Sequence, residues 1–200
     1  LNYNFVPLLG KVTIMENGNF VKHTTFYIIG LSYQKADADM RGKFSLDAQA
    51  KSNLMQQAKD EGIEALLVTS TCNRTEIYGF AQHPFQLIQL LCENTRGTVE
   101  EFQKVAYIYK NKDAIAHMFR VGSGLDSQIL GDFEIISQLK TSVRISKKFD
   151  LLNHFTERLV NAVIQASKRI KTETEISSGA TSVSFASVQY ILSTVEDISN

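Results

Sequence analysis

The chain has 200 residues, which suits one domain of ordinary size, or one domain and the start of another. Hydrophobic residues make up 44% of it, and no stretch approaches the roughly 18 uncharged apolar residues of a spanning helix, so the composition predicts a buried core and no membrane anchor. The formal net charge of zero argues against a uniformly basic nucleic-acid binder. Two cysteines do not make a disulfide framework. They predict reduced thiols and a cytoplasmic location, since the start of the chain also lacks the pattern of an export signal.

Basic residues are concentrated in one stretch of this neutral chain. Residues 140–171 contain eight of them and only two acidic residues. The basic ones are Lys140, Arg144, Lys147, Lys148, Arg158, Lys168, Arg169 and Lys171. Such a run is typical of a solvated helical surface. It is equally typical of a patch that faces phosphates, and the sequence leaves both interpretations open.

The first 22 residues predict an N-terminal extension or a disordered segment, because they mix short apolar pieces with Pro and Gly. Alternating apolar and aromatic residues then predict strands at 25–33, 65–71, 75–81 and 104–110. Helices are expected at 46–60, with Ser45 as its N-cap, and at 84–93, which begins at Pro84. This βαββαβ order predicts an α+β fold over residues 23–110, namely a ferredoxin-like antiparallel sheet.

Residues 111–200 predict a helical segment that follows the sheet. Apolar residues at helical spacing indicate helices at 113–121, 132–148, 156–175 and 182–195. No internal repeat interrupts this order.

The densest polar cluster, residues 70–76, follows an apolar strand directly and contains Cys72. A strand end is a rigid platform, and a thiol with a cation nearby is a candidate nucleophile. Arg74 is that cation, and its guanidinium could also clamp a carboxylate with two parallel hydrogen bonds. The alternative is a polar hairpin turn with an incidental cysteine. Cys92, by contrast, follows a run of leucines and is predicted to be a core thiol.

His117 is the second candidate for chemistry. In a helix it lies about 200° from Ile115, which predicts a position away from the core. It is then either a surface histidine or the acid/base partner that a nucleophilic cysteine commonly uses.

Gly122, Gly124 and Ser127 form a near miss to the dinucleotide fingerprint G-x-G-x-x-G. That fingerprint needs a preceding strand, and here a helix is expected before it, so the match is rejected. The segment is predicted to be a polar loop that lines a substrate site, or else a simple connection between helices.

Four motifs in this order closely resemble the glutamyl-tRNA reductase family, over residues 24–200. They are STCNRTEIY at 70–78, His117 followed by Arg120, SGLDSQILG at 123–131 and SGATSVSFASV at 178–188. The family uses NADPH to reduce glutamate esterified to its tRNA. The product is glutamate-1-semialdehyde, the start of tetrapyrrole (porphyrin and heme) synthesis.

The resemblance implies a role for each matching residue. Cys72 would attack the ester and hold glutamate as a thioester, Arg74 would bind the glutamate carboxylate, and His117 would matter for activity through proton transfer. The further substrate-binding positions that it implies are Thr71, Asn73, Ser127, Asp132, Phe133, Glu134 and Gln138. One departure is visible, because the family commonly has Gly-Glu-Pro-Gln where this chain has Gly-Asp-Phe-Glu at 131–134.

The family's NADPH-binding and dimerisation domains have no counterpart in these 200 residues, because no complete G-x-G-x-x-G is present. Residues 111–200 are therefore expected to complete the catalytic domain and lead toward the NADPH domain. The chain itself is expected to carry only the thioester-forming half of the reaction. The partners that the resemblance implies are glutamyl-tRNA, a second copy of the full-length protein in a homodimer, and the next enzyme of the pathway for hand-over of the product.

Two other classes of function fit part of the pattern. A generic cysteine-dependent acyl hydrolase or transferase would use Cys72 and His117 without a nucleotide. A non-enzymatic RNA-binding module would share the βαββαβ order and stack bases on strand aromatics such as Tyr107 and Tyr109, but the K/R-G-F/Y-G/A-F pattern of such modules is absent.

Overall fold

The computed structural model describes residues 15–16, 19–20, 24–132 and 134–176. The motif at 178–188, the helix expected at 182–195 and Phe133 lie outside the described residues, as does most of the predicted N-terminal extension. The strands are β1 (Met15–Glu16), β2 (Asn19–Phe20), β3 (Thr25–Ser32), β4 (Leu66–Ser70), β5 (Arg74–Ala81) and β6 (Tyr107–Lys110). The helices are α1 (Ala38–Lys43), α2 (Ala48–Asp60), α3 (Pro84–Glu93), α4 (Val99–Val105), α5 (Asn111–Gly122), α6 (Glu134–Lys148) and α7 (His154–Glu173).

The main sheet has the strand order β4-β5-β3-β6, and every neighbouring pair is antiparallel. Strand β5 lies between β3 and β4, which α1 and α2 connect. Strand β3 likewise lies between β5 and β6, which α3 and α4 connect. This is the split-βαβ arrangement. The predicted α+β fold with a ferredoxin-like sheet followed by helices is therefore confirmed.

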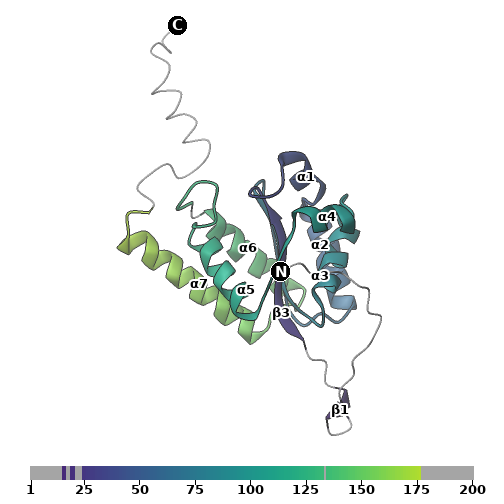
Figure 1. The fold of residues 1–200 in the computed structure, drawn as a ribbon. Helices are drawn as coiled ribbons and strands as arrows, with labels where there is room; N and C mark the ends of the chain where they lie inside the picture. The colour runs from purple at the N-terminus through teal and green to yellow at the C-terminus, as the bar shows by residue number, and fades with distance from the viewer. Residues whose placement is uncertain (1–14, 17–18, 21–23, 133, 177–200) are drawn as a thin grey trace.

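Helices cover both faces of this sheet, with α1–α4 on one side and α5–α7 on the other (Figure 1). Successive residues of a strand point to opposite faces, so Ile29 and Leu31 of β3 join the core under α2–α4, while Phe26 and Ile28 join the core under α5–α7. Strands buried on both faces are apolar almost without interruption. The face that an RNA-binding ferredoxin-like module would offer to bases is covered here, so the structure argues against that alternative.

The N-terminal end of α2 differs from the prediction. The helix begins at Ala48, and its N-cap is Asp47, whose side chain accepts a hydrogen bond from the backbone N–H of Ala50. Ser45, the predicted cap, instead bonds back to the carbonyl of Gly42 at the end of the short helix α1, which was not predicted. Both aspartate and serine are good caps, and only the chain path decides between them.

The strand expected at 104–110 is shorter than predicted. Residues 99–105 form α4, which Thr98 and Glu101 start with a reciprocal capping box, and only Tyr107–Lys110 pair as β6. The threonine and the glutamate three residues later are a helix-start signal that the alternating aromatic residues obscured. In the described part of the chain, no helix is both long and apolar enough to cross a bilayer.

A close contact between α5 and α7 requires glycine at position 122. A methyl group there would overlap the Cγ1 atom of Val163, whereas a methyl group at Gly42 in α1 would meet nothing within 4 Å. We expect Gly122→Ala to lower the free energy of unfolding by about 1–3 kcal/mol, because overpacking strains a filled core. Gly42→Ala is the matched control and should be neutral or stabilising by up to about 1 kcal/mol. Urea unfolding of both variants checks this, and equal midpoints would contradict it.

Candidate functional site

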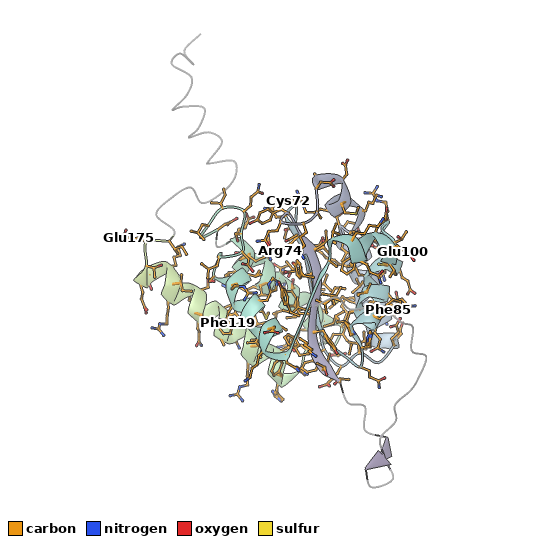
Figure 2. The ribbon with its side chains drawn as sticks, in the orientation of Figure 1. Cys72, Arg74, Phe85, Glu100, Phe119 and Glu175 are labelled. Atoms are coloured by element: carbon orange, nitrogen blue, oxygen red, sulfur yellow. The ribbon has the colours of Figure 1, made fainter. Side chains whose placement is uncertain are left out.

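Cys72 lies in the tight turn that joins β4 to β5. The side chain of Thr71 shapes the turn, because its Oγ1 accepts hydrogen bonds from the backbone N–H groups of Asn73, at 3.1 Å, and Arg74, at 3.2 Å. The Thr71 N–H also donates to the Arg74 carbonyl at 2.8 Å. This leaves Cys72 exposed at the tip, while the next residues return into the sheet (Figure 2).

A polar pocket opens beside this turn. It encloses about 410 Å³, including space open to solvent. One wall is the turn at 71–74, and the other is made by the loop that follows α5 and by the first turns of α6. The lining residues are Thr71, Cys72, Asn73, Arg74, Ser127, Gln128, Asp132, Glu134, Ile135 and Gln138.

The tertiary structure brings together residues that are far apart in the sequence. Of the ten predicted site residues, eight line this pocket. Phe133 lies outside the described residues, and His117 does not line the pocket. Gln128 and Ile135 line it without having been predicted. The functional roles of the eight predicted residues stay predictions, but their location around one pocket is a property of the fold.

Glu76 is the centre of a buried polar cluster behind the pocket. Its Oε1 accepts hydrogen bonds from Arg74 Nη1 at 3.1 Å, from the Tyr107 hydroxyl at 2.5 Å and from His117 Nε2 at 2.6 Å, while its Oε2 accepts one from the Tyr78 hydroxyl. The Glu76 side chain has no exposed surface. A carboxylate with this many donors can remain ionised away from water.

The charges in this cluster stabilise one another. Burial alone would raise the pKa of Glu76, but the adjacent Arg74 charge and the hydrogen bonds from His117 and Tyr107 lower it to about 2. Burial alone would lower the pKa of Arg74, yet the Glu76 carboxylate raises it above its ordinary value. Burial and the same carboxylate raise the pKa of both Tyr78 and Tyr107 well above the usual range. The cluster is thus one ion pair held by neutral hydroxyl groups.

His117 occupies a different position from the one predicted. Its side chain is only 5% exposed and lies against the sheet, stacked on the Tyr109 ring with centroids 4.6 Å apart. The buried stripe of α5 runs through Ala114, Met118 and Val121, so Ile115 was the wrong reference for the core face. His117 Nδ1 lies 3.4 Å from Asp126 Oδ2, and Nε2 contacts Glu76. The predicted acid/base partner of Cys72 therefore contacts the carboxylate that holds Arg74.

Arg74 connects the buried cluster to the pocket. It is 5% exposed, and while Nη1 bonds Glu76, Nη2 donates to the carbonyl of Asp126 at 2.5 Å. The Tyr33 hydroxyl donates to the neighbouring carbonyl of Ser127 at 3.1 Å. These two bonds attach the loop after α5 to the sheet, and the loop then forms the second wall of the pocket. Figure 2 shows Arg74 deeper in the molecule than Cys72.

Glu76, Tyr78 and Tyr107, the acidic and aromatic members of the cluster, were not predicted to belong to the site. Arg74, Glu76 and Tyr78 alternate along β5, which puts all three on the face that α5–α7 cover. Gly30 of β3 lies opposite Glu76, and a methyl group there would be 2.7 Å from Glu76 Cγ. The sequence did contain one signal for this cluster: the charged residues Arg74 and Glu76 both belong to β5, a strand buried on both faces. Buried charges are normally paired, so these two were candidates for an ion pair.

Cys92 behaves as predicted. It is a free, half-buried thiol on α3 that packs against the core under α2–α4. Burial, followed by the charges of Glu100 and Glu93, raises the pKa of Cys92 to about 11. A thiol with such a pKa is a weak nucleophile at neutral pH.

The described residues contain neither a group of metal ligands nor a complete dinucleotide fingerprint. No group of His, Cys, Asp and Glu there could hold a metal ion. Gly122 is the last residue of helix α5 and Gly124 follows that helix, with no strand directly before them, so this segment does not fit the phosphate-binding turn of NADPH.

The fold and the site together define an α+β domain that presents an exposed cysteine beside a polar pocket with a buried arginine. The family model described as "Glutamyl-tRNAGlu reductase, N-terminal domain" matches residues 29–174, and the chain belongs to this family. The resemblance stated from the motifs is thereby confirmed.

Two curated relatives are named glutamyl-tRNA reductase. The one from Flavobacterium psychrophilum is 75% identical over 92% of this chain and 45% of the relative. The one from Christiangramia forsetii is 71% identical over 92% of this chain and 44% of the relative. A solved structure, glutamyl-tRNA reductase from Methanopyrus kandleri, matches with a TM-score of 0.66 at 23% identity, over 83% of this chain and 39% of that one, which supports the fold. The chain thus spans less than half the length of these relatives.

Removing the charge of Glu76 should destabilise the protein strongly. In Glu76→Gln, the Arg74 guanidinium remains buried without its counter-ion, so we expect the free energy of unfolding to fall by about 3–5 kcal/mol. The matched control is Lys59→Ala, which removes the exposed ion pair to Asp150 and should cost at most about 1 kcal/mol. Urea unfolding at neutral pH measures both, and a Glu76→Gln protein as stable as the control would refute the role of the buried pair.

The same carboxylate predicts a dependence of stability on pH. Because the pKa of Glu76 is about 2 in the folded protein, below its ordinary 4.5, the ionised group stabilises the fold above pH 4.5. This contribution is lost as the pH falls from 4.5 toward 2. We expect the difference in unfolding free energy between wild type and Glu76→Gln to shrink across that range. Urea midpoints measured between pH 6 and pH 2 test this, and a constant difference would contradict the assignment.

Proposed function

We propose that this chain carries the thioester-forming site of an NADPH-dependent glutamyl-tRNA reductase, the first enzyme of tetrapyrrole synthesis. The observation that carries the proposal is the placement of an exposed thiol and a buried, permanently charged guanidinium on one pocket. The family membership and the names of the relatives support it.

Cys72 is the proposed nucleophile. Its Sγ attacks the carbonyl carbon of the glutamyl ester, and a C–S bond forms as the C–O bond to the terminal ribose breaks. The proton of the thiol ends on the released ribose hydroxyl. The product is a glutamyl thioester on Cys72 and free tRNA. A thioester is a better electrophile than the oxygen ester, so a difficult reduction becomes two easier steps.

Arg74 is proposed to bind the side-chain carboxylate of glutamate. Its bonds to Glu76 and to the Asp126 carbonyl use two of the five guanidinium N–H groups, among the described residues. The remaining N–H groups can hold a carboxylate with two parallel bonds, and burial makes this pairing stronger than it would be in water. Arg74 is fixed before substrate arrives, so little ordering of its side chain remains to be done on binding.

The opposite wall suits the other polar groups of the substrate. Asp132 and Glu134 both line the pocket, and their carboxylates are proposed to bind the α-ammonium group of the glutamyl ester. Hydrogen-bonding groups for the ester and the ribose are proposed at Thr71, Asn73, Ser127 and Gln138, which line the same pocket. The resemblance adds Phe133 to this set. Glu134, where the family commonly has glutamine, would make the site more acidic.

His117 is proposed to act through the Glu76 cluster. Its Nε2 bonds the carboxylate that pairs with Arg74, and its Nδ1 faces Asp126, whose carbonyl Arg74 contacts. These contacts support a role in holding Arg74 and the loop after α5. Proton transfer by His117, which the resemblance implied, remains a prediction that these contacts do not by themselves support.

The rest of the reaction is proposed to involve parts of a longer protein. Hydride from NADPH, bound by a separate domain, would reduce the thioester to glutamate-1-semialdehyde. A homodimer and hand-over of the product to the next enzyme are proposed on the same resemblance, and a cytoplasmic location is proposed on the two free cysteines. For the tRNA, the basic residues on α6 and α7 are proposed to face phosphates, since Lys140, Arg144, Lys147, Arg158 and Lys168 are all exposed.

Substituting the nucleophile tests the proposal directly. We expect Cys72→Ser to lose at least about a thousandfold in the rate of glutamyl-tRNA cleavage and to form no labelled thioester, because a serine hydroxyl is far less nucleophilic. Cys92→Ser is the control and should cleave at the wild-type rate. Cleavage at the normal rate by Cys72→Ser would refute the proposal. NADPH-dependent aldehyde formation by the full-length protein separates a reductase from a cysteine-dependent hydrolase, which needs no nucleotide.

A further inference from the structure

Helix α1 contacts the turn that carries Cys72, through a residue that no part of the proposed chemistry uses. Arg41 Nε donates to the carbonyl oxygen of Cys72 at 2.8 Å, and Arg41 Nη1 donates to the carbonyl of Ala36 at 2.6 Å. The guanidinium therefore joins the peptide of Cys72 to the start of α1, across 31 residues of sequence.

We propose that Arg41 is a positioning residue for the nucleophile, holding the turn so that the Cys72 thiol stays at the mouth of the pocket. This inference rests on the proposed function, because it assigns Arg41 a part in the acylation of Cys72. Arg41 itself contacts the main chain of Cys72 and does not line the pocket.

The rest of the turn shows why this bond matters. Hydrogen bonds to Thr71 Oγ1 fix Asn73 and Arg74, and the N–H of Tyr33 donates to the Asn73 carbonyl at 2.9 Å. Within the part of the chain that the structure describes, Arg41 supplies the hydrogen bond to the carbonyl of Cys72. The two sides of the turn are thus held by the sheet, while its reactive tip is held by α1.

Helix α1 is itself anchored, so it can serve as a fixed point. Its N-cap Asp37 accepts a hydrogen bond from the N–H of Met40. At its other end, the backbone N–H of Arg96 donates to the Lys43 carbonyl at 3.0 Å, and the Lys43 side chain pairs with Glu101 of α4, so both contacts persist when the Arg96 side chain is replaced. Arg41 extends this anchored helix to the nucleophile.

An arginine is suited to this task for a geometric reason. Its guanidinium is planar and holds two N–H groups at a fixed angle, so one side chain can bridge two carbonyls. A lysine keeps the charge, but its ammonium is a single point on a flexible stem. Arg41→Lys therefore separates geometry from charge.

The proposal predicts a split between two reactions of the same thiol. Attack on a bound ester requires the sulfur and the carbonyl carbon to be aligned at about 3–3.5 Å, and a misplacement of about 1 Å can cost about a hundredfold in rate. Alkylation by iodoacetamide, a small reagent in solution, requires no such alignment. Loosening the turn should therefore slow acylation and leave alkylation nearly unchanged.

The test compares Arg41→Met and Arg41→Lys with Arg96→Met in the full-length protein. Arg96 is the matched control, because it also donates to a carbonyl of α1 but does not touch Cys72. For Arg41→Met we expect single-turnover acylation by saturating glutamyl-tRNA to fall about 10- to 100-fold. The half-saturating tRNA concentration and the alkylation rate of Cys72 should each stay within about threefold of wild type. Arg41→Lys should recover less than about a tenth of the lost rate, and Arg96→Met should acylate normally.

A second measurement is independent of the chemistry. Amide hydrogen exchange in the peptide that contains residues 71–74 should be at least about threefold faster in both Arg41 variants than in Arg96→Met, because the tip of the turn loses its anchor. Normal acylation or unchanged exchange in a folded Arg41→Met would overturn the inference. Equal losses of acylation and alkylation would also overturn it, since Arg41 would then act on thiol reactivity. If wild type is not acylated by glutamyl-tRNA, the proposed function fails, and the exchange data alone decide whether Arg41 holds the turn.

Discussion

The buried ion pair between Arg74 and Glu76 is the interaction on which the site depends. Taking two charges out of water costs several kcal/mol for each ion, and the pair is tolerated because hydroxyl and imidazole donors satisfy the carboxylate. The same pair fixes the guanidinium in one wall of the pocket and, through the Asp126 carbonyl, attaches the loop that forms the opposite wall. One electrostatic contact thus organises both sides of the site.

The site combines a rigid, buried part with an exposed, reactive one. Arg74 belongs to β5 and to the core under α5–α7, whereas Cys72 lies two residues earlier in an exposed turn. Such a division suits the proposed function, in which a preorganised charge selects a small carboxylate and the thiol is open to the end of a large RNA. Helices α5–α7 make this division possible, because they cover one face of the sheet and provide the low-dielectric surroundings that strengthen the pairing of charges.

The pocket also accommodates the departure from the family motif at 131–134. Asp132 and Glu134 lie on the wall opposite Arg74, and Asp132 accepts a hydrogen bond from the N–H of Glu134 at the start of α6. Acidic groups near a helix N-terminus are favoured by the helix dipole. The replacement of glutamine by glutamate is thus compatible with the local structure, and it places negative charge where the proposed substrate carries its ammonium group.

The sequence by itself determined the strand and helix order, the position of Cys72 after a buried strand, and most of the pocket residues, the last through the family motifs. Periodicity records which face of an element is apolar, so β3, β5, α3 and the helices α5, α6 and α7 followed from it. It failed at α1, at α4 and at the face of His117. The helix-capping signals at α1 and α4 are local and are outweighed by the strand-like pattern around them. Helix α5 packs between the sheet and another helix, so it has two buried sides and its apolar stripe does not identify the exposed one.

Only the tertiary structure decided that Glu76 lies between Arg74 and His117, and that Arg41 reaches the peptide of Cys72. These contacts join residues that the chain separates by up to 41 positions, and no local pattern encodes which distant donor a buried carboxylate will meet.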